Sequence, residues 1–131
     1  MGQVFAANSR EAVEDENAES YGDVPWLGEY IFMYDDICRL REKTGELIDA
    51  QKDAFFGGAN LASLEKFAQA GLVRALAQPE AWEQRVGKKL PGGEPVFCAA
   101  HRAVLVSFLD GVVRAVAAAR ANKTGVFFYG E

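Results

Sequence analysis

Apolar residues recur at three- and four-residue steps through the middle of the chain, which is the spacing of one helix face. Residues 33–55 follow this pattern, and the pair Gly57-Gly58 ends it. Gly45 interrupts the run and is a point at which the helix could split or bend. A second stretch of the same kind begins at Asn60, a residue that can cap a helix, and stops at Gln78-Pro79. The pattern therefore predicts two long helices in this half of the chain.

The C-terminal third predicts a wide apolar helix after a loop. Residues 88–95 contain two prolines and two glycines and read as the loop. A short helix at 80–86, anchored by Trp82, is expected before this loop, and a helix from about Phe97 to Ala121 is expected after it. Because the apolar face of this last helix is so wide, we expect it at the centre of the fold.

The two ends of the chain are patterned differently. A polar helix is expected from Arg10 to about Gly22, with Asn8 or Ser9 as its cap. The short apolar segments 3–7 and 125–130 predict strands that could pair with each other.

These elements predict a mainly α fold, a helical bundle of four to five helices, with a small β element as an option if the terminal strands pair. A chain of 131 residues fits a single domain covering residues 1–131. No apolar run approaches the roughly 18 residues of a membrane span, and the N-terminus lacks a signal-peptide pattern. We therefore expect a cytoplasmic protein without membrane contact.

The distribution of charge bears on function, because the excess of acidic residues lies in the N-terminal part of the chain. Residues 1–40 hold nine acidic and two basic residues, whereas residues 41–131 hold ten acidic and twelve basic residues. An acidic N-terminal face would repel nucleic-acid phosphates and attract a basic protein partner. A solvated, solubilising helix face is the alternative interpretation.

Aromatic residues are interleaved with acids over residues 23–36. Tyr and Trp are enriched at the energetic centres of protein interfaces, and nearby carboxylates can steer a basic partner. Tyr30, Phe32 and Tyr34 surround one helix axis, so at least one aromatic must be exposed or lie in an interface. The predicted partner-binding residues are Asp23, Trp26, Glu29, Tyr30, Tyr34, Asp35 and Asp36.

Candidate catalytic groups are sparse. Cys98 and His101 would share one face of the last helix, but zinc needs four ligands, and the only other cysteine is Cys38. A nucleophilic pair would also need an oxyanion-hole donor. We therefore expect His101 to be a buried, hydrogen-bonded core residue, both thiols to be free, and the protein to be neither an enzyme nor a holder of a metal or other cofactor.

The acidic stretch from Glu11 to Asp36, and the aromatic and acidic segment from Trp26 to Asp36 within it, resemble those of small acidic bacterial immunity proteins. That resemblance implies a cytoplasmic protein that neutralises a cognate toxin, such as a basic nuclease, in contact-dependent growth inhibition. The acidic face would cover the toxin's basic cleft, and aromatic anchors would slow dissociation.

A different function class stays open beside this one. A helical ligand-binding or regulatory protein would carry an apolar pocket between the first long helix and the last helix, near Cys38, Cys98 and His101.

Overall fold

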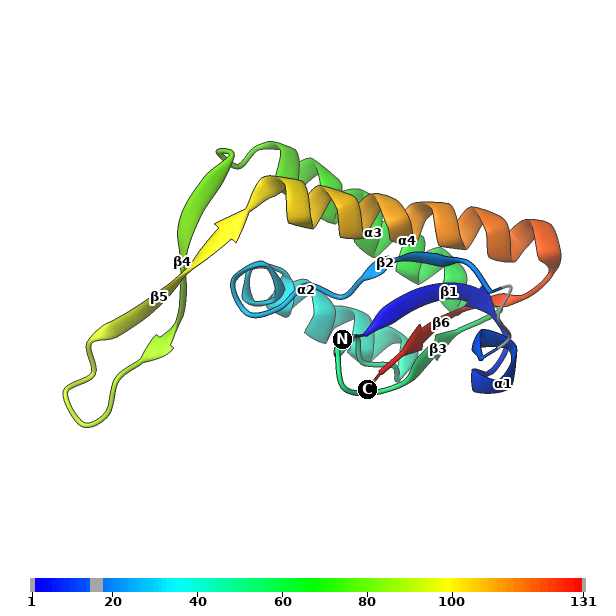
Figure 1. Ribbon diagram of the computed structural model, residues 1–131, viewed down its shortest axis with the longest axis horizontal. Helices are drawn as coiled ribbons and strands as arrows, with labels where there is room; N and C mark the ends of the chain where they lie inside the picture. The colour runs from blue at the N-terminus through cyan, green and yellow to red at the C-terminus, as the bar shows by residue number, and fades with distance from the viewer. Residues whose placement is uncertain (1, 15–17, 131) are drawn as a thin grey trace.

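The computed structural model describes residues 2–14 and 18–130, and in this part of the chain six strands accompany four helices (Figure 1). A four-stranded antiparallel sheet has the order β2-β1-β6-β3, and β4 and β5 form a separate antiparallel hairpin. The prediction of a mainly α helical bundle is therefore wrong, because the architecture is α+β. In chain order the elements are β1 (Gln3–Ala7), α1 (Arg10–Val13), β2 (Ser20–Asp23), α2 (Gly28–Thr44), β3 (Ala54–Phe56), α3 (Asn60–Leu76), β4 (Ala81–Lys88), β5 (Pro95–His101), α4 (Arg102–Asn122) and β6 (Gly125–Tyr129).

The two predicted terminal strands are confirmed, and so is their pairing. Strand β1 runs antiparallel to β6 over its whole length, from Gln3 opposite Tyr129 to Ala7 opposite Gly125. Strand β6 also pairs with β3, so the C-terminal strand lies inside the sheet rather than at its edge. The pair of terminal strands, expected only as a small addition to a helical bundle, is thus the centre of the main sheet.

Three predicted helices are shorter than expected or replaced by strands. Helix α1 covers only four residues, and the part of the expected helix at residues 15–17 lies outside the described residues. Helix α2 ends at Thr44 because Gly45 adopts a left-handed conformation, with a φ of 79°, and the chain then turns into β3. The helix expected at 80–86 is strand β4.

The last predicted helix also begins later than expected. Residues 97–101 belong to β5, and only from Arg102 does the chain become helical. Along β4 and β5, half-buried and exposed residues alternate, as they must when successive side chains of a strand point to opposite faces.

The main core lies between the sheet and the helices α2, α3 and α4. From the sheet, Val4, Phe56 and Phe128 are fully buried, and Leu64 and Leu105 meet them from α3 and α4. The opposite face of the sheet carries a smaller cluster formed by Phe5, Ala7, Val13 and Phe127, in which Val13 comes from α1. Successive side chains of β1 and β6 point to opposite faces of the sheet, so these two strands contribute residues to both clusters.

The hairpin β4–β5 extends away from the sheet and the helices (Figure 1). Its base is held by the start of α2, where Phe32 packs edge-on against Trp82 with ring centroids 5.3 Å apart. A Cβ on Gly28 would lie 2.5 Å from the carbonyl oxygen of Ala99, so the close approach of α2 to β5 requires glycine at this position.

Within the described residues, we find no helix that combines the length and the apolar character needed to cross a membrane.

Candidate functional site

The start of α2 presents an apolar surface to solvent. Trp26 is 63% exposed, Leu27 40% and Tyr34 46%, so three large apolar side chains of this segment reach solvent. Leu27, Tyr30, Ile31 and Tyr34 follow one another at three- and four-residue steps and therefore share one side of the helix. We call Trp26, Leu27, Tyr30, Ile31 and Tyr34 together the Trp26 surface.

The Trp26 surface borders a hollow of about 220 Å³. Helix α2 forms one side, and the segment between α2 and β3 forms the other, with Asp49, Ala50 and Gln51. One Asp49 carboxylate oxygen accepts a hydrogen bond from the backbone N–H of Gln51, at 2.8 Å, which fixes the turn. The hollow therefore combines an aromatic wall with one carboxylate.

Tyr30 joins the two sides of this hollow. Its hydroxyl donates a 2.6 Å hydrogen bond to the backbone carbonyl of Ile48. Burial, followed by the nearby charge of Asp49, raises the pKa of Tyr30 to about 12. The ring of Tyr34 lies 6.0 Å from that of Tyr30, and a hydrogen bond with the Cys38 thiol raises the pKa of the Tyr34 phenol.

Two of the three acidic site residues predicted on α2 have carboxylates that contact other groups of the chain, as the hydroxyl of Tyr30 also does. Glu29 is buried and accepts a 2.9 Å hydrogen bond from the backbone N–H of His101. Asp36 forms ion pairs with Arg39 on its own helix and with Arg74 on α3. Since these carboxylates are already partnered, the exposed charge near the aromatic residues is smaller than the sequence suggested.

The other five predicted residues are accessible to differing degrees. The structure brings Trp26, Tyr30 and Tyr34 together on the Trp26 surface, and Asp35 is exposed next to Tyr34. Asp23 is exposed at the end of β2, outside the hollow.

Sequence reasoning missed three residues at this site. Leu27 and Ile31 could have been found, because they share the helical spacing of Tyr30 and Tyr34. Asp49 carried no such signal, since its place beside Tyr30 depends on how the chain turns after Gly45.

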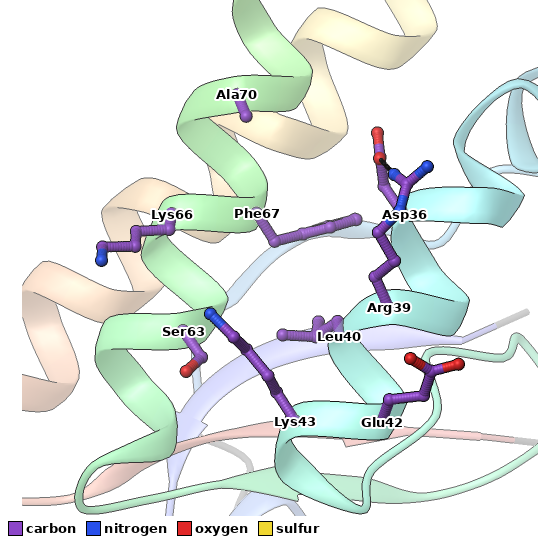
Figure 2. Close-up of a pocket in the computed structure, with 9 residues that line it drawn as sticks. All are labelled: Asp36, Arg39, Leu40, Glu42, Lys43, Ser63, Lys66, Phe67 and Ala70. Carbon is purple, nitrogen blue, oxygen red and sulfur yellow. Dashed lines mark hydrogen bonds and ion pairs between the residues drawn. The ribbon is translucent and has the colours of Figure 1, made fainter.

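A larger groove of about 480 Å³ lies between α2 and α3 (Figure 2). Leu40 and Phe67, both buried, form its apolar floor. Figure 2 shows Leu40 and Lys43 directed from α2 toward α3, and Phe67 directed from α3 toward α2. The charged residues that line this groove are Asp36, Arg39, Glu42, Lys43 and Lys66.

The expectation that Cys98 and His101 share one face of the last helix is wrong. Cys98 and His101 lie three positions apart on strand β5, so their side chains point to opposite faces rather than sharing one helix face. His101 is also exposed instead of buried in the core, and its Nδ1 lies 3.9 Å from the Glu29 carboxylate. Cys38 and Cys98 are both free thiols, as expected.

The two hollows described above lie elsewhere than the pocket expected between the first long helix and the last. Neither of them is lined by Cys38, Cys98 or His101. In the described ranges, no three His, Cys, Asp or Glu residues are grouped closely enough to hold a metal ion.

Comparison with protein-family models, with curated proteins and with solved structures found no match. The residues of this chain alone therefore carry the functional argument.

Proposed function

We propose that this chain is a non-catalytic binding protein that holds a protein partner on the Trp26 surface. The observation that carries the proposal is the exposure of Trp26 and Leu27 at a hollow, with the exposed Tyr34 packed next to Tyr30, which also lines it. Tryptophan and tyrosine dominate binding energy when a partner covers them, because each buries a large area with few rotatable bonds. A concave neighbour gives the partner a place for one anchoring side chain.

The chemistry of the surface favours a partner that presents an apolar or cationic side chain. Asp49 lines the hollow, and the exposed Asp35 follows Tyr34 directly in α2. A lysine or arginine entering the hollow would lie against aromatic rings and near a carboxylate, which combines cation–π and ionic attraction.

The specific form that we propose is an immunity protein, and its partner is a basic toxin domain. The acidic character of residues 1–40 supports this form, because Glu11, Glu19, Asp23 and Asp35 are exposed even though Glu29 and Asp36 have partners within the chain. An acidic protein would be steered toward a basic toxin, and the aromatic surface would then slow dissociation. Inhibition would result from covering the toxin's cleft, without turnover.

The test first asks whether a gene next to the gene for this chain encodes a toxin. Co-expression of the wild-type chain with that toxin should restore growth, and Trp26→Ala combined with Tyr34→Ala should abolish the protection. The matched control is Val73→Ala combined with Leu76→Ala, which removes two exposed apolar side chains from α3 instead. Protection that survives the first double variant would reject the Trp26 surface, and a neighbouring toxin whose toxicity the wild-type chain leaves unchanged would reject the immunity function.

Charge is tested separately with Asp35→Lys. Asp36 is unsuitable for this purpose, because its ion pairs with Arg39 and Arg74 also join α2 to α3. If carboxylates steer the partner, Asp35→Lys should slow association and reduce its dependence on salt. An unchanged association rate would remove Asp35 from the interface.

A second candidate function rests on the groove between α2 and α3. Its apolar floor of Leu40 and Phe67, with Lys43 at the side, fits an amphiphile with an anionic head. Titration with a long-chain fatty acid should then show saturable binding that Lys43→Glu weakens. Binding that is absent, or that Lys43→Glu leaves unchanged, would reject this function.

A further inference from the structure

Strand β4 has an outer edge that no other strand of the described chain pairs with. The hydrogen-bond pattern shows which backbone groups lie on this edge. Glu80 and Arg102 form a hydrogen-bonded pair, because the N–H of Arg102 donates to the carbonyl of Glu80 at 3.0 Å. The next pair, Ala81 and His101, is not hydrogen-bonded, because the N–H of His101 donates to the Glu29 carboxylate. Since hydrogen-bonded and non-hydrogen-bonded pairs alternate in antiparallel strands, Ala81, Glu83 and Arg85 direct their backbone groups away from β5.

The other edge of the hairpin is closed at its base. Gly28 and Glu29 of α2 lie against Ala99 and His101 of β5, so this edge already has a neighbour. The outer edge of β4 is therefore the edge of the hairpin to which a further strand can be added. An unpaired edge of this kind is a template for pairing with another chain.

The outer half of the hairpin has little to stabilise it within one chain. Val86, Val96, Phe97 and Cys98 belong to neither hydrophobic cluster of the described residues. An isolated two-stranded ribbon is at best marginally stable in water, whereas further strands add both hydrogen bonds and packing. This hairpin would thus gain from a neighbour along β4.

The sequence of β4 is complementary to itself in one antiparallel register. When two copies face each other about Gln84, Glu83 of each comes opposite Arg85 of the other. These are the positions whose backbone groups point outward, so each opposed pair can also exchange two backbone hydrogen bonds. Registers centred on Glu83 or on Arg85 would instead set like charges directly opposite each other, which is destabilising.

We propose that two copies of this chain associate through the outer edges of β4, antiparallel, with the two-fold axis at Gln84. The product is a four-stranded sheet in the order β5-β4-β4-β5, and its interface is isologous, as in most symmetric dimers. In the single chain, the side-chain amide of Gln84 donates a 3.2 Å hydrogen bond to the carbonyl of Arg85. In the dimer, this carbonyl instead accepts a hydrogen bond from the backbone of the second copy. This association is independent of the proposed function, because it uses residues outside the Trp26 surface.

The test measures the mass of the full-length chain by sedimentation over a range of concentrations. The wild-type chain should form dimers, and Glu83→Arg or Arg85→Glu alone should each weaken self-association by more than about tenfold, because two pairs become like-charged. Mixed together, these two single variants should form a heterodimer, since each then meets the opposite charge. A homodimer should also return in the double variant that carries both changes.

A proline variant tests the backbone hydrogen bonds apart from charge. Arg85→Pro removes an N–H that points away from β5, so the monomer should keep its far-ultraviolet spectrum and thermal transition while dimerisation is lost. Glu94→Arg, a charge reversal between β4 and β5, is the matched control and should leave the dimer unchanged. A wild-type chain that is monomeric at every concentration would overturn the proposal, as would a dimer that survives Arg85→Pro or single variants that fail to pair when mixed.

Discussion

Two adjacent side chains at the start of α2 connect this helix to distant parts of the chain. Tyr30 reaches the carbonyl of Ile48, after the end of the helix, and Glu29 reaches the N–H of His101, at the end of β5. One contact fixes the hollow beside the Trp26 surface, and the other fixes the base of the hairpin. Single residues therefore position both features that carry our proposals.

The Tyr30 contact depends on a protonated phenol, because only the neutral form donates a hydrogen bond. Burial raises the pKa of Tyr30 to about 12, above the value of about 10 for an unfolded chain. Its contribution to stability is therefore complete below about pH 10 and is lost as the pH rises from about 10 toward 12. Denaturant titrations should show this alkaline loss for the wild type and a smaller one for Tyr30→Phe. Identical pH profiles for the two proteins would contradict the assignment.

The Glu29 contact should be visible in stability at neutral pH. Glu29→Ala leaves the backbone N–H of His101 without its partner and should lower the free energy of unfolding by about 1–3 kcal/mol. Glu29→Gln keeps an oxygen that can accept this bond and should recover most of the loss. Urea denaturation measures both, and equal stabilities for the two variants would show that the hydrogen bond contributes nothing.

At the scale of elements, close backbone approaches decide how the helices and strands fit together. A Cβ on Gly111 of α4 would lie 2.0 Å from the carbonyl oxygen of Tyr21, so β2 rests directly on this helix. The ion pair of Asp36 with Arg74 joins α2 to α3, and Arg74 also lies 4.7 Å above the ring of Phe32. These contacts fix β2 relative to α4 and α2 relative to α3.

Replacement of Gly111 by alanine tests the approach of β2 to α4. Although alanine favours a helix over glycine by about 1 kcal/mol, the clash with Tyr21 should outweigh this gain and lower the melting temperature. Ser107→Ala, at an exposed position of the same helix, is the matched control and should cause no loss. A Gly111→Ala protein at least as stable as the wild type would show that β2 can move away without loss.

At the scale of the whole molecule, both ends of the chain form the centre of the main sheet. Strand β6 pairs with β1 on one side and with β3 on the other, so the sheet is complete only when the last strand is present. The aromatic residues of the fold range from full burial to high exposure. Phe128 lies in the main core, whereas Trp26 lies mostly in solvent.

This contrast predicts opposite results for two aromatic truncations. Phe128→Ala should lower the free energy of unfolding by about 3–5 kcal/mol, because it leaves a cavity in the core. Trp26→Ala should change it by less than about 1 kcal/mol and affect only partner binding. Chemical denaturation of the two variants provides the comparison, and a large loss for Trp26→Ala would place this residue in the fold rather than in an interface.

The sequence by itself determined the elements whose local signals agree. The terminal strands and the helix that begins at Asn60 have a clear period or clear stop residues. The loop expected at 88–95 is also present, except that its end residues Lys88 and Pro95 pair in β4 and β5. The exposure of an aromatic residue on α2 was also predictable, because residues around one helix axis cannot all face the core.

Only the tertiary structure decided the hairpin and the roles of single acids. Residues 80–86 and 97–101 contain apolar residues that suit either period, and the pairing of β4 with β5 selects the strand. Glu29 and Asp36 differ from Asp35 only in what other elements place beside them, namely His101 for one and Arg74 for the other. Such long-range neighbours leave no trace in the local pattern of the chain, which is why composition alone overstated the acidic face.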